Sequence, residues 1–411
     1  MSEMLDVVIV GGGLVGGLTA LLLAQGGVQA TVLDAAPVLD QEKTLAVMNP
    51  RVLALSQATI HLLKTVGVWN GLARQMPYSG MQVWNKNGYG EINFGHTSEQ
   101  QPHPDQALGS MVEPSVLNVA IQQKMLQQLQ DYRTQVKVIR IEKIPQGWAI
   151  QLADGTTLKT KLLIGADGAN SFVREQAYID LDVLDYKQAA ISCAIKTTQP
   201  NQYVARQIFL PTGPLAYLPM ASLEPQENGY WQSIVWTLPD DYADEYSALT
   251  DQAFMQLLTQ ESLHMLGEVV DVRSRAQFPL KARAAQRYVK SGLALIGDAA
   301  HVIHPLAGQG VNIGCLDAAV LCDVLLHDLK RGGVWAHEQT LLRYEHLRKG
   351  QNDAMMHSLS AIGWLESSEL FPFVWARNFG LKQVEQFDGL KDRFMQQANG
   401  LGALQQTRYA C

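Results

Sequence analysis

The sequence predicts an α/β fold in which a Rossmann-like nucleotide-binding domain is interrupted by a mostly antiparallel β-sheet domain and followed by a helical C-terminal region. Three observations predict it. Residues 6–10 are an apolar run of β-forming residues, and glycines and an apolar helix to about Gln25 follow them. Between about Tyr186 and Pro279 the pattern changes to alternating strands. At residues 293–296 a buried parallel-strand pattern returns, so we expect a discontinuous first domain.

Spacing of apolar residues predicts the remaining elements. A strand over residues 29–33 completes the first βαβ unit, and helical spacing predicts a helix over 116–129. Further strands are predicted over residues 136–144, 148–152, 158–164, 189–195, 207–210 and 232–238, and a further helix over 316–329.

These elements define three predicted domains. Residues 1–75, 111–180 and 285–340 form the nucleotide-binding domain, residues 76–110 and 181–284 form the β-sheet domain that we expect to bind substrate, and residues 341–411 form the C-terminal helical region.

Composition excludes several classes of protein. The 411 residues are 47% apolar and 17% charged, which is typical of a folded enzyme with two or three domains. The net charge is −7 and the lysines and arginines are not clustered, so we expect no nucleic-acid partner. The four cysteines lack metal-ligand spacing, which predicts no metal site and free thiols in a reducing cytoplasm.

The apolar stretch over residues 5–24 is long enough to suggest a signal anchor. Its five glycines, at 11–13 and 16–17, weaken a membrane-spanning helix but suit a strand, a turn and a packed helix. We therefore interpret it as the first unit of the nucleotide-binding domain.

The first chemical motif is Gly11-x-Gly13-x-x-Gly16, which lies between the first strand and its helix. Glycines there let the backbone approach a pyrophosphate, which the N-terminus of a helix attracts. Asp34 ends the next strand, where a carboxylate binds the ribose hydroxyls of a dinucleotide. The alternative for the glycines is a tight turn without a ligand, and the alternative for Asp34 is a solvated carboxylate at a strand end. No second motif of this kind follows a later strand.

Two later blocks complete the pattern. Residues 165–171 read Gly-Ala-Asp-Gly-Ala-Asn-Ser and contain Asp167; a simple helix entry is the alternative. The third block begins at Gly297 and Asp298, where a strand ends and a carboxylate can bind a polyol chain. It continues through Pro305, Gly308, Gln309, Gly310, Val311, Asn312, Gly314 and Asp317.

The three blocks, in this order and over nearly the whole chain, resemble the single-component FAD aromatic hydroxylases that include p-hydroxybenzoate hydroxylase. The resemblance implies that the first block holds the ADP part of FAD. It implies that Asp167 lies near the flavin and the incoming nicotinamide cofactor. It also implies that Asp298 binds the ribityl–pyrophosphate region, and that residues 308–312 line the flavin ring.

Closer similarity is to the ubiquinone-biosynthesis hydroxylases, which act on polyprenylated phenols or benzoquinols. It rests on Arg51-Val-Leu-Ala-Leu-Ser, on Gly-Val-Trp at 67–69, on Met-Gln-Val-Trp at 81–84 and on the sequence from His304 to Asn312. The resemblance places Arg51 beside FAD; a solvated surface arginine is the alternative. Two departures are Pro50 and the Glu113-Pro114 pair, which stands where the family usually has Glu-Asn.

The resemblance implies a monooxygenase mechanism. NAD(P)H binds transiently and reduces FAD, dioxygen adds to the reduced flavin, and the flavin hydroperoxide transfers oxygen to a hydrophobic aromatic substrate. His304, with Pro305 beside it, is the candidate for proton handling or for the substrate edge, and a structural loop histidine is the alternative.

Other functions stay open at this stage. One is a non-catalytic FAD-bearing scaffold in a biosynthetic complex, and another is a different FAD enzyme, such as a reductase or a halogenase, although the halogenase signature Trp-x-Trp-x-x-Pro is absent. The C-terminal region contains Trp364, Phe371, Phe373, Trp375 and Phe379. It is a candidate for docking on the inner-membrane surface or on a partner, with ordinary packing as the alternative. We expect a cytoplasmic protein, and the sequence leaves its oligomeric state open.

Overall fold

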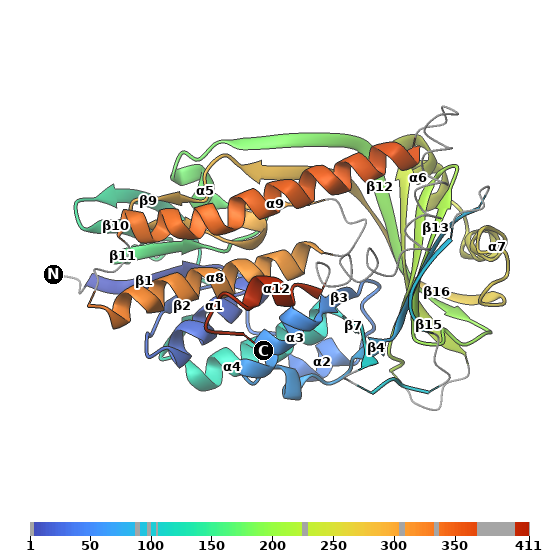
Figure 1. The fold of residues 1–411 in the computed structure, drawn as a ribbon, viewed down its shortest axis with the longest axis horizontal. Coiled ribbons are helices and arrows are strands. Elements are labelled where there is room, and N and C mark those ends of the chain that lie inside the picture. The colour runs from blue at the N-terminus through green and yellow to red at the C-terminus, as the bar shows by residue number, and fades with distance from the viewer. Residues whose placement is uncertain are drawn as a thin grey trace.

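The computed structural model describes residues 4–86, 91–96, 100–103, 106–223, 229–303, 309–332, 337–367 and 399–410, with the side chains of 359–367 left undescribed. Two large β-sheets lie at opposite ends of the molecule, and the long helix α9 (Glu338–Ser367) runs from one end toward the other (Figure 1).

Sheet A is the mixed sheet of the nucleotide-binding fold. Its strands follow the order β17 (Val289–Lys290), β18 (Leu293–Leu295), β11 (Thr157–Gly165), β1 (Met4–Val10), β2 (Thr31–Leu33) and β8 (Asp131–Arg133), and β10 (Gly147–Leu152) and β9 (Val138–Ile144) extend from β11. Strand β1 is parallel to both β11 and β2, and its residues 7–10 are buried. Buried Val, Ile and Leu side chains on both faces explain the continuous apolar run.

The strands that carry the motifs end in one row. Val10 lies opposite Leu33 on one side and Gly165 on the other, and Gly165 lies opposite Leu295. Ligands of open α/β sheets bind at the carboxyl ends of the strands, so this row defines the edge where a cofactor is expected. The motif residues that follow the four strands at this edge are Gly11, Asp34, Asp167 and Asp298.

Helices cover sheet A. Helix α1 is buried from Gly16 to Leu23 and packs against α8, whose apolar side chains are also mostly buried. Helix α8 is apolar and long enough to cross a membrane, but 78% of its most apolar window is buried within the protein, as in a core helix. The helices around sheet A and its neighbours are α1 (Leu14–Gln25), α2 (Gln41–Leu45), α3 (Gln57–Thr65), η1 (Trp69–Gly71), α4 (Pro114–Gln128), α5 (Phe172–Gln176), η3 (Gly297–Ala299), α8 (Gly310–Lys330) and α12 (Leu401–Leu404).

Sheet C is the second large sheet. Its order is β19 (His301–Val302), β16 (Val269–Ala285), β12 (Leu181–Thr197), β15 (Tyr230–Pro239), β14 (Gly213–Pro219), β13 (Val204–Leu210), β5 (Gly80–Asn85) and β6 (Glu91–Gly95). All of these pairs are antiparallel except β13 with β5. The 17-residue strands β12 and β16 continue as a two-stranded ribbon toward sheet A (Figure 1).

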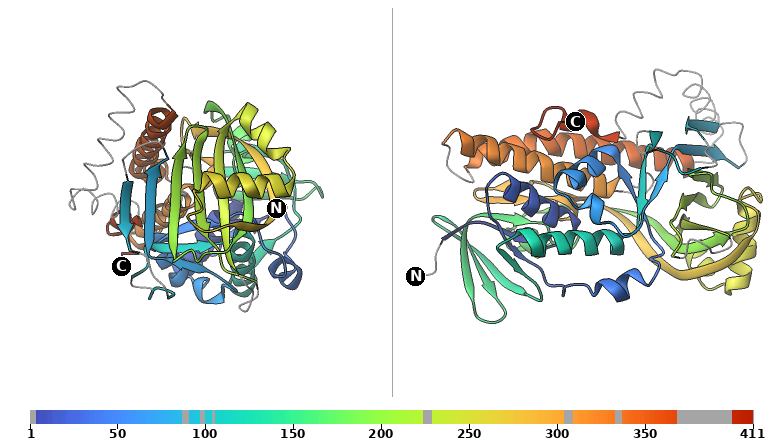
Figure 2. Two further views of the ribbon diagram at one scale, coloured as in Figure 1. Left: turned by 90° about the vertical axis from the view of Figure 1, so that its right-hand side faces the viewer. Right: turned by 90° about the horizontal axis from the view of Figure 1, so that it is seen from below.

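A small sheet B lies between sheets A and C, and its strand order is β3 (Leu53–Ser56), β7 (Gly109–Val112) and β4 (Met76–Tyr78). One face of sheet C is covered by α6 (Asp240–Ser247) and α7 (Asp251–Glu261), which stand in front of its strands in Figure 2. Trp236 and Phe254 pack at this face. The other face contributes Ala194 and Trp231 to an apolar cluster with residues near sheet B.

The predicted fold class is confirmed, and each predicted strand and helix named above has a counterpart. Helices α6 and α7 were not predicted, because the stretch over 186–279 was interpreted as strands alone. Local signals explain them: Asp240 and Asp241 lie at the positive N-terminus of α6, and Thr250 accepts a hydrogen bond from the Ala253 amide at the start of α7. The domain boundaries stay a prediction.

A buried charged cluster joins α8 and α9 to the end of β18. The carboxylate of Asp317, fully buried on α8, contacts the Arg348 Nε atom of α9 at 2.8 Å and the His301 Nε2 atom at 2.5 Å. Burial by itself would raise the pKa of Asp317, but the charges and hydrogen bonds of His301 and Arg348 lower it to about 2. Asp317 is therefore ionised in the folded protein.

Asp317 should make stability pH-dependent. Because its pKa in the folded state lies below the ordinary value of 3.8, its contribution is fully present above about pH 4 and is lost as the pH falls toward 2. The shift corresponds to roughly 2 kcal/mol. We expect the difference in unfolding free energy between wild type and Asp317→Asn to shrink over this range in urea denaturation. Asp6→Asn, in the half-exposed pair with Lys161, is the control and should show little difference. A pH-independent difference for Asp317→Asn would contradict this reasoning.

Candidate active site

The glycine motif forms a close turn with open space beside it. At Gly11, where φ is +106°, a Cβ atom would lie 2.2 Å from the Ala166 carbonyl oxygen, and at Gly16 it would lie 2.0 Å from the Gly11 oxygen. A Cβ at Gly13, the N-cap of α1, would meet no described atom within 4 Å. Gly11 and Gly16 are thus required by the fold, whereas Gly13 borders the space that a pyrophosphate would occupy.

Asp34 lies against this turn. Its Oδ1 atom accepts a hydrogen bond from the Ala36 amide at 2.9 Å, and a Cβ at Gly12 would come within 2.5 Å of its Oδ2 atom. The carboxylate is half-buried rather than fully solvated. Asp34 therefore lies beside the glycine turn, as a ribose-binding carboxylate would, and its ribose-binding role stays a prediction.

Asp167 has a capping role in this structure. Its oxygens accept hydrogen bonds from the Ser171 hydroxyl at 2.5 Å and the Val173 amide at 3.0 Å, at the start of α5. This is the helix-entry alternative considered above. The same block reaches the third motif through Arg174, which donates to the carbonyl oxygens of Ala169 and Ala299.

Asp298 and Arg51 lie in one electrostatic environment, although 247 positions separate them in the sequence. The Asp298 carboxylate retains accessible surface but is surrounded by protein atoms, so desolvation raises its pKa, while the positive charges of His301 and Arg51 act in the opposite direction. These two predicted site residues are therefore close enough to influence each other electrostatically. An exposed arginine facing a partly desolvated carboxylate suits a cofactor that carries both hydroxyl and phosphate groups.

The segment that carries Arg51 is anchored by a buried ion pair. Glu113 accepts hydrogen bonds from Arg74 at 2.5 and 3.0 Å and from the Asn49 amide at 2.6 Å. Arg74 also donates to the carbonyl oxygens of Leu45 and Val47. Glu113, which the sequence marked only as part of a departure from the family pattern, thus fixes the backbone ahead of Arg51.

The same segment reaches the substrate-side sheet. The Ser233 hydroxyl on β15 donates to the Pro50 carbonyl oxygen at 2.7 Å. Met48 and Val52 belong to a buried apolar cluster, hereafter the interlayer cluster, whose members are Met48, Val52, Tyr78, Met111, Ala194, Ala205, Met220 and Trp231. Burial raises the pKa of Tyr78 to about 12, so its hydroxyl keeps its proton at neutral pH.

The end of the third block begins helix α8. Asn312 is buried, and its amide accepts from the Ser56 amide and the Thr59 hydroxyl and donates to the Ala54 carbonyl oxygen. It therefore ties α8 to sheet B. The neighbouring predicted residues Gln309, Gly310 and Val311 are half-buried at the start of the helix. His304, Pro305 and Gly308 lie outside the described residues.

Sequence reasoning missed the polar residues behind the Gly297–Asp298 turn. His301 and Asp317 both fall within the third block, but nothing in the sequence indicated that they form a pair; in the structure they are buried and lie 2.5 Å apart. The Nδ1 atom of His301 has no hydrogen-bond partner within the part of the chain that the structure describes. Leaving such an atom unpaired costs about 1–3 kcal/mol. The signal that could have identified Asp317 is its charge within the apolar stretch 313–326, because a carboxylate in a buried helix needs polar partners.

Comparison with known proteins identifies the family. Residues 4–358 match the family model described as FAD binding domain. The chain is 35% identical over 408 residues to the 3-demethoxyubiquinol 3-hydroxylase of Escherichia coli K12, covering 96% of this chain and 98% of that protein. It is 34% identical over 402 residues to the ubiquinone hydroxylase UbiL of Rhodospirillum rubrum, covering 97% and 90%.

A solved structure shows a similar fold. The crystal structure of p-nitrophenol 4-monooxygenase PnpA from Pseudomonas putida DLL-E4 superposes with a TM-score of 0.75 at 17% identity, covering 97% of this chain and 98% of that one. The glycine turn, the Asp34 carboxylate and the Asp298–Arg51 pair fit the cofactor that this family binds. The chain belongs to the FAD binding domain family and is an FAD-dependent aromatic-ring hydroxylase.

Proposed function

We propose that this chain hydroxylates the ring of a polyprenylated phenol or benzoquinol in ubiquinone biosynthesis, with NAD(P)H and O₂ as co-substrates. The main support is the position of the Arg51 segment, which contacts Asp298 electrostatically on one side and the apolar interlayer cluster on the other. The names of the E. coli and R. rubrum relatives indicate the same substrate class.

The proposal assigns the cofactor to residues at the carboxyl edge of sheet A. Gly11, Gly13 and Gly16 with the N-terminus of α1 would hold the pyrophosphate, and Asp34 would hold the adenosine ribose. Asp298 and Arg51 would bind the ribityl–pyrophosphate region. When bound, FAD accepts electrons from NAD(P)H and activates dioxygen. The roles of residues 308–312 at the flavin ring, and of His304 and Pro305 in catalysis, remain predictions.

The substrate would enter between the Arg51 segment and sheet C. The interlayer cluster combines three methionines with aromatic and small side chains, and methionine adapts its shape to irregular apolar groups. Buried side chains of this kind would pack well beside a ring with an apolar tail. Protein groups there would orient the ring and exclude water. Excluding water would suppress side reactions during oxygen transfer.

We further propose a cytoplasmic protein that reaches its apolar substrate at the inner-membrane surface or within a biosynthetic complex. The aromatic residues Phe371, Phe373, Trp375 and Phe379 that suggested this contact lie outside the described residues, and the side chain of Trp364 is not described. The rival interpretation, an FAD-bearing scaffold without turnover, would keep the same cofactor residues.

Turnover distinguishes these two functions. The purified protein should show a flavin absorption spectrum, and a short-chain prenylphenol or demethoxyquinol should stimulate NAD(P)H oxidation, because substrate binding completes the water-excluded site. Mass spectrometry with ¹⁸O₂ should show one labelled oxygen in the product. Flavin binding with no product from either substrate would favour the scaffold.

Gly13→Ala should weaken FAD binding without harming the fold. A Cβ atom there meets no described atom, and the backbone φ of −68° suits alanine. The methyl group would instead occupy the pyrophosphate space, and we expect the Kd for FAD, measured by fluorescence titration, to rise at least about tenfold. Gly71→Ala is the matched control, because its Cβ also meets no described atom and it lies on η1, away from this edge. Equal FAD affinity of both variants would remove Gly13 from the site.

A further inference from the structure

We propose that Asp317 is a positioning residue for Asp298, acting through both ends of the turn that carries it. This inference rests on the proposed cofactor role of Asp298. The turn runs from Gly297 to His301 and separates β18 from β19. Asp317 lies 19 residues beyond Asp298 on helix α8, at the end of the third block, where sequence reasoning assigned it no role.

One oxygen of Asp317 holds both ends of the turn. The Gly297 amide donates to its Oδ2 atom at 3.2 Å, and the Nε2 atom of His301 contacts the same oxygen at 2.5 Å. Within the turn, Gly297 and Ala299 are buried, whereas Asp298 between them is exposed. Because both ends are fixed, the backbone that carries Asp298 at the middle of the turn is held in place at the edge of sheet A.

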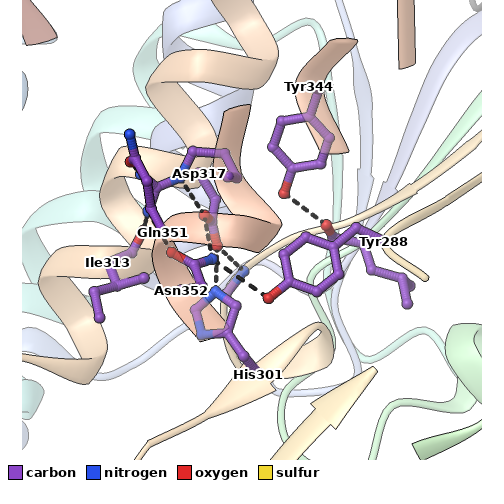
Figure 3. Close-up of polar contacts among 10 residues, drawn as sticks. Tyr288, His301, Ile313, Asp317, Tyr344, Gln351 and Asn352 are labelled. Carbon is purple, nitrogen blue, oxygen red and sulfur yellow. Dashed lines mark hydrogen bonds and ion pairs between the residues drawn. The ribbon is translucent and has the colours of Figure 1, made fainter. Parts of the chain in front are cut away.

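The other oxygen is fixed by helix α9. Arg348 donates through Nε at 2.8 Å and Asn352 through Nδ2 at 3.2 Å, and all three side chains are buried. Arg348 also donates to the Ile313 carbonyl oxygen at 3.3 Å, one turn before Asp317 on α8. Figure 3 shows the Asp317 carboxylate with the side chains of Asn352 and His301 both below it. The carboxylate therefore has donors on both oxygens and cannot rotate without losing them.

This arrangement also fixes the histidine. An ionised carboxylate only accepts hydrogen bonds, so Nε2 of His301 carries the proton, and Nδ1 is left as the second polar atom of the ring. Nδ1 is buried and has no partner among the described residues. These contacts thus leave one oriented polar atom three residues from Asp298, available to a hydroxyl group of a bound ligand.

The test compares two carboxylates that both join α8 to α9. Asp317→Asn should raise the Kd for FAD at least about tenfold, as second-layer changes do at other ligand sites. Asp328→Asn is the matched control, because Asp328 contacts Arg343 and Thr340 but not the turn; it should change the Kd less than about twofold. Kd values come from flavin fluorescence quenching, and circular dichroism of the FAD-free proteins confirms that each is folded.

His301 variants keep the inference testable if Asp317→Asn does not fold. Gln carries an amide donor that can reach Asp317, whereas Leu carries none, so His301→Gln should retain wild-type FAD affinity within about threefold and His301→Leu should lose at least about tenfold. Equal affinity of His301→Gln and His301→Leu, or an unchanged Kd in folded Asp317→Asn, would overturn the inference.

Asp298→Asn separates this inference from the proposed site. If Asp298→Asn weakens FAD binding but the Asp317 and His301 variants do not, the positioning role alone is wrong. If Asp298→Asn leaves the Kd unchanged, the assignment of Asp298 to the cofactor fails, and the positioning role fails with it.

Discussion

The site depends on one register constraint, the alignment of four parallel strand ends in sheet A. Val10, Leu33, Gly165 and Leu295 are paired in one row, so the residues after them emerge at one edge. A shift of one residue would turn every side chain of β1 to the opposite face of the sheet, disrupt its packing on both faces and separate the motifs. Burial of the core, with Val8, Ile9 and Leu163 almost inaccessible, therefore also determines where the chemistry lies.

The sequence predicted this edge well because its signals are local. Glycines at fixed spacing, an acidic residue at a strand end and an apolar strand can each be identified within about ten residues, and the register then brings them together. The same local reasoning left Asp167 with two interpretations. Its neighbours Ser171 and Val173 take up both carboxylate oxygens, so the capping geometry gives the residue a structural role that the motif does not state.

The polar contacts between distant segments could not be predicted. Glu113 binds Arg74 and the Asn49 amide across 39 and 64 positions, and Ser233 reaches Pro50 across 183. No spacing rule connects such residues, because their proximity follows from the packing of sheet B against sheet C. Helices α6 and α7 were missed for a different reason: their local signals are the acidic residues Asp240 and Asp241 in the first turn of α6 and the capping residue Thr250 of α7, and these were not used.

Pro50 and Glu113 now have a common physical explanation. Proline has no amide hydrogen and a fixed φ, so at position 50 it stiffens the segment while its carbonyl oxygen remains available to Ser233. Glu113 is 4% exposed and needs a cation, which Arg74 supplies, and removing either partner would leave a buried charge without compensation. The ion pair and the proline thus hold the Arg51 segment from two sides. The two departures from the family pattern lie in the backbone support of Arg51, which we propose as an FAD-site residue, and they leave the glycine motifs of sheet A unchanged.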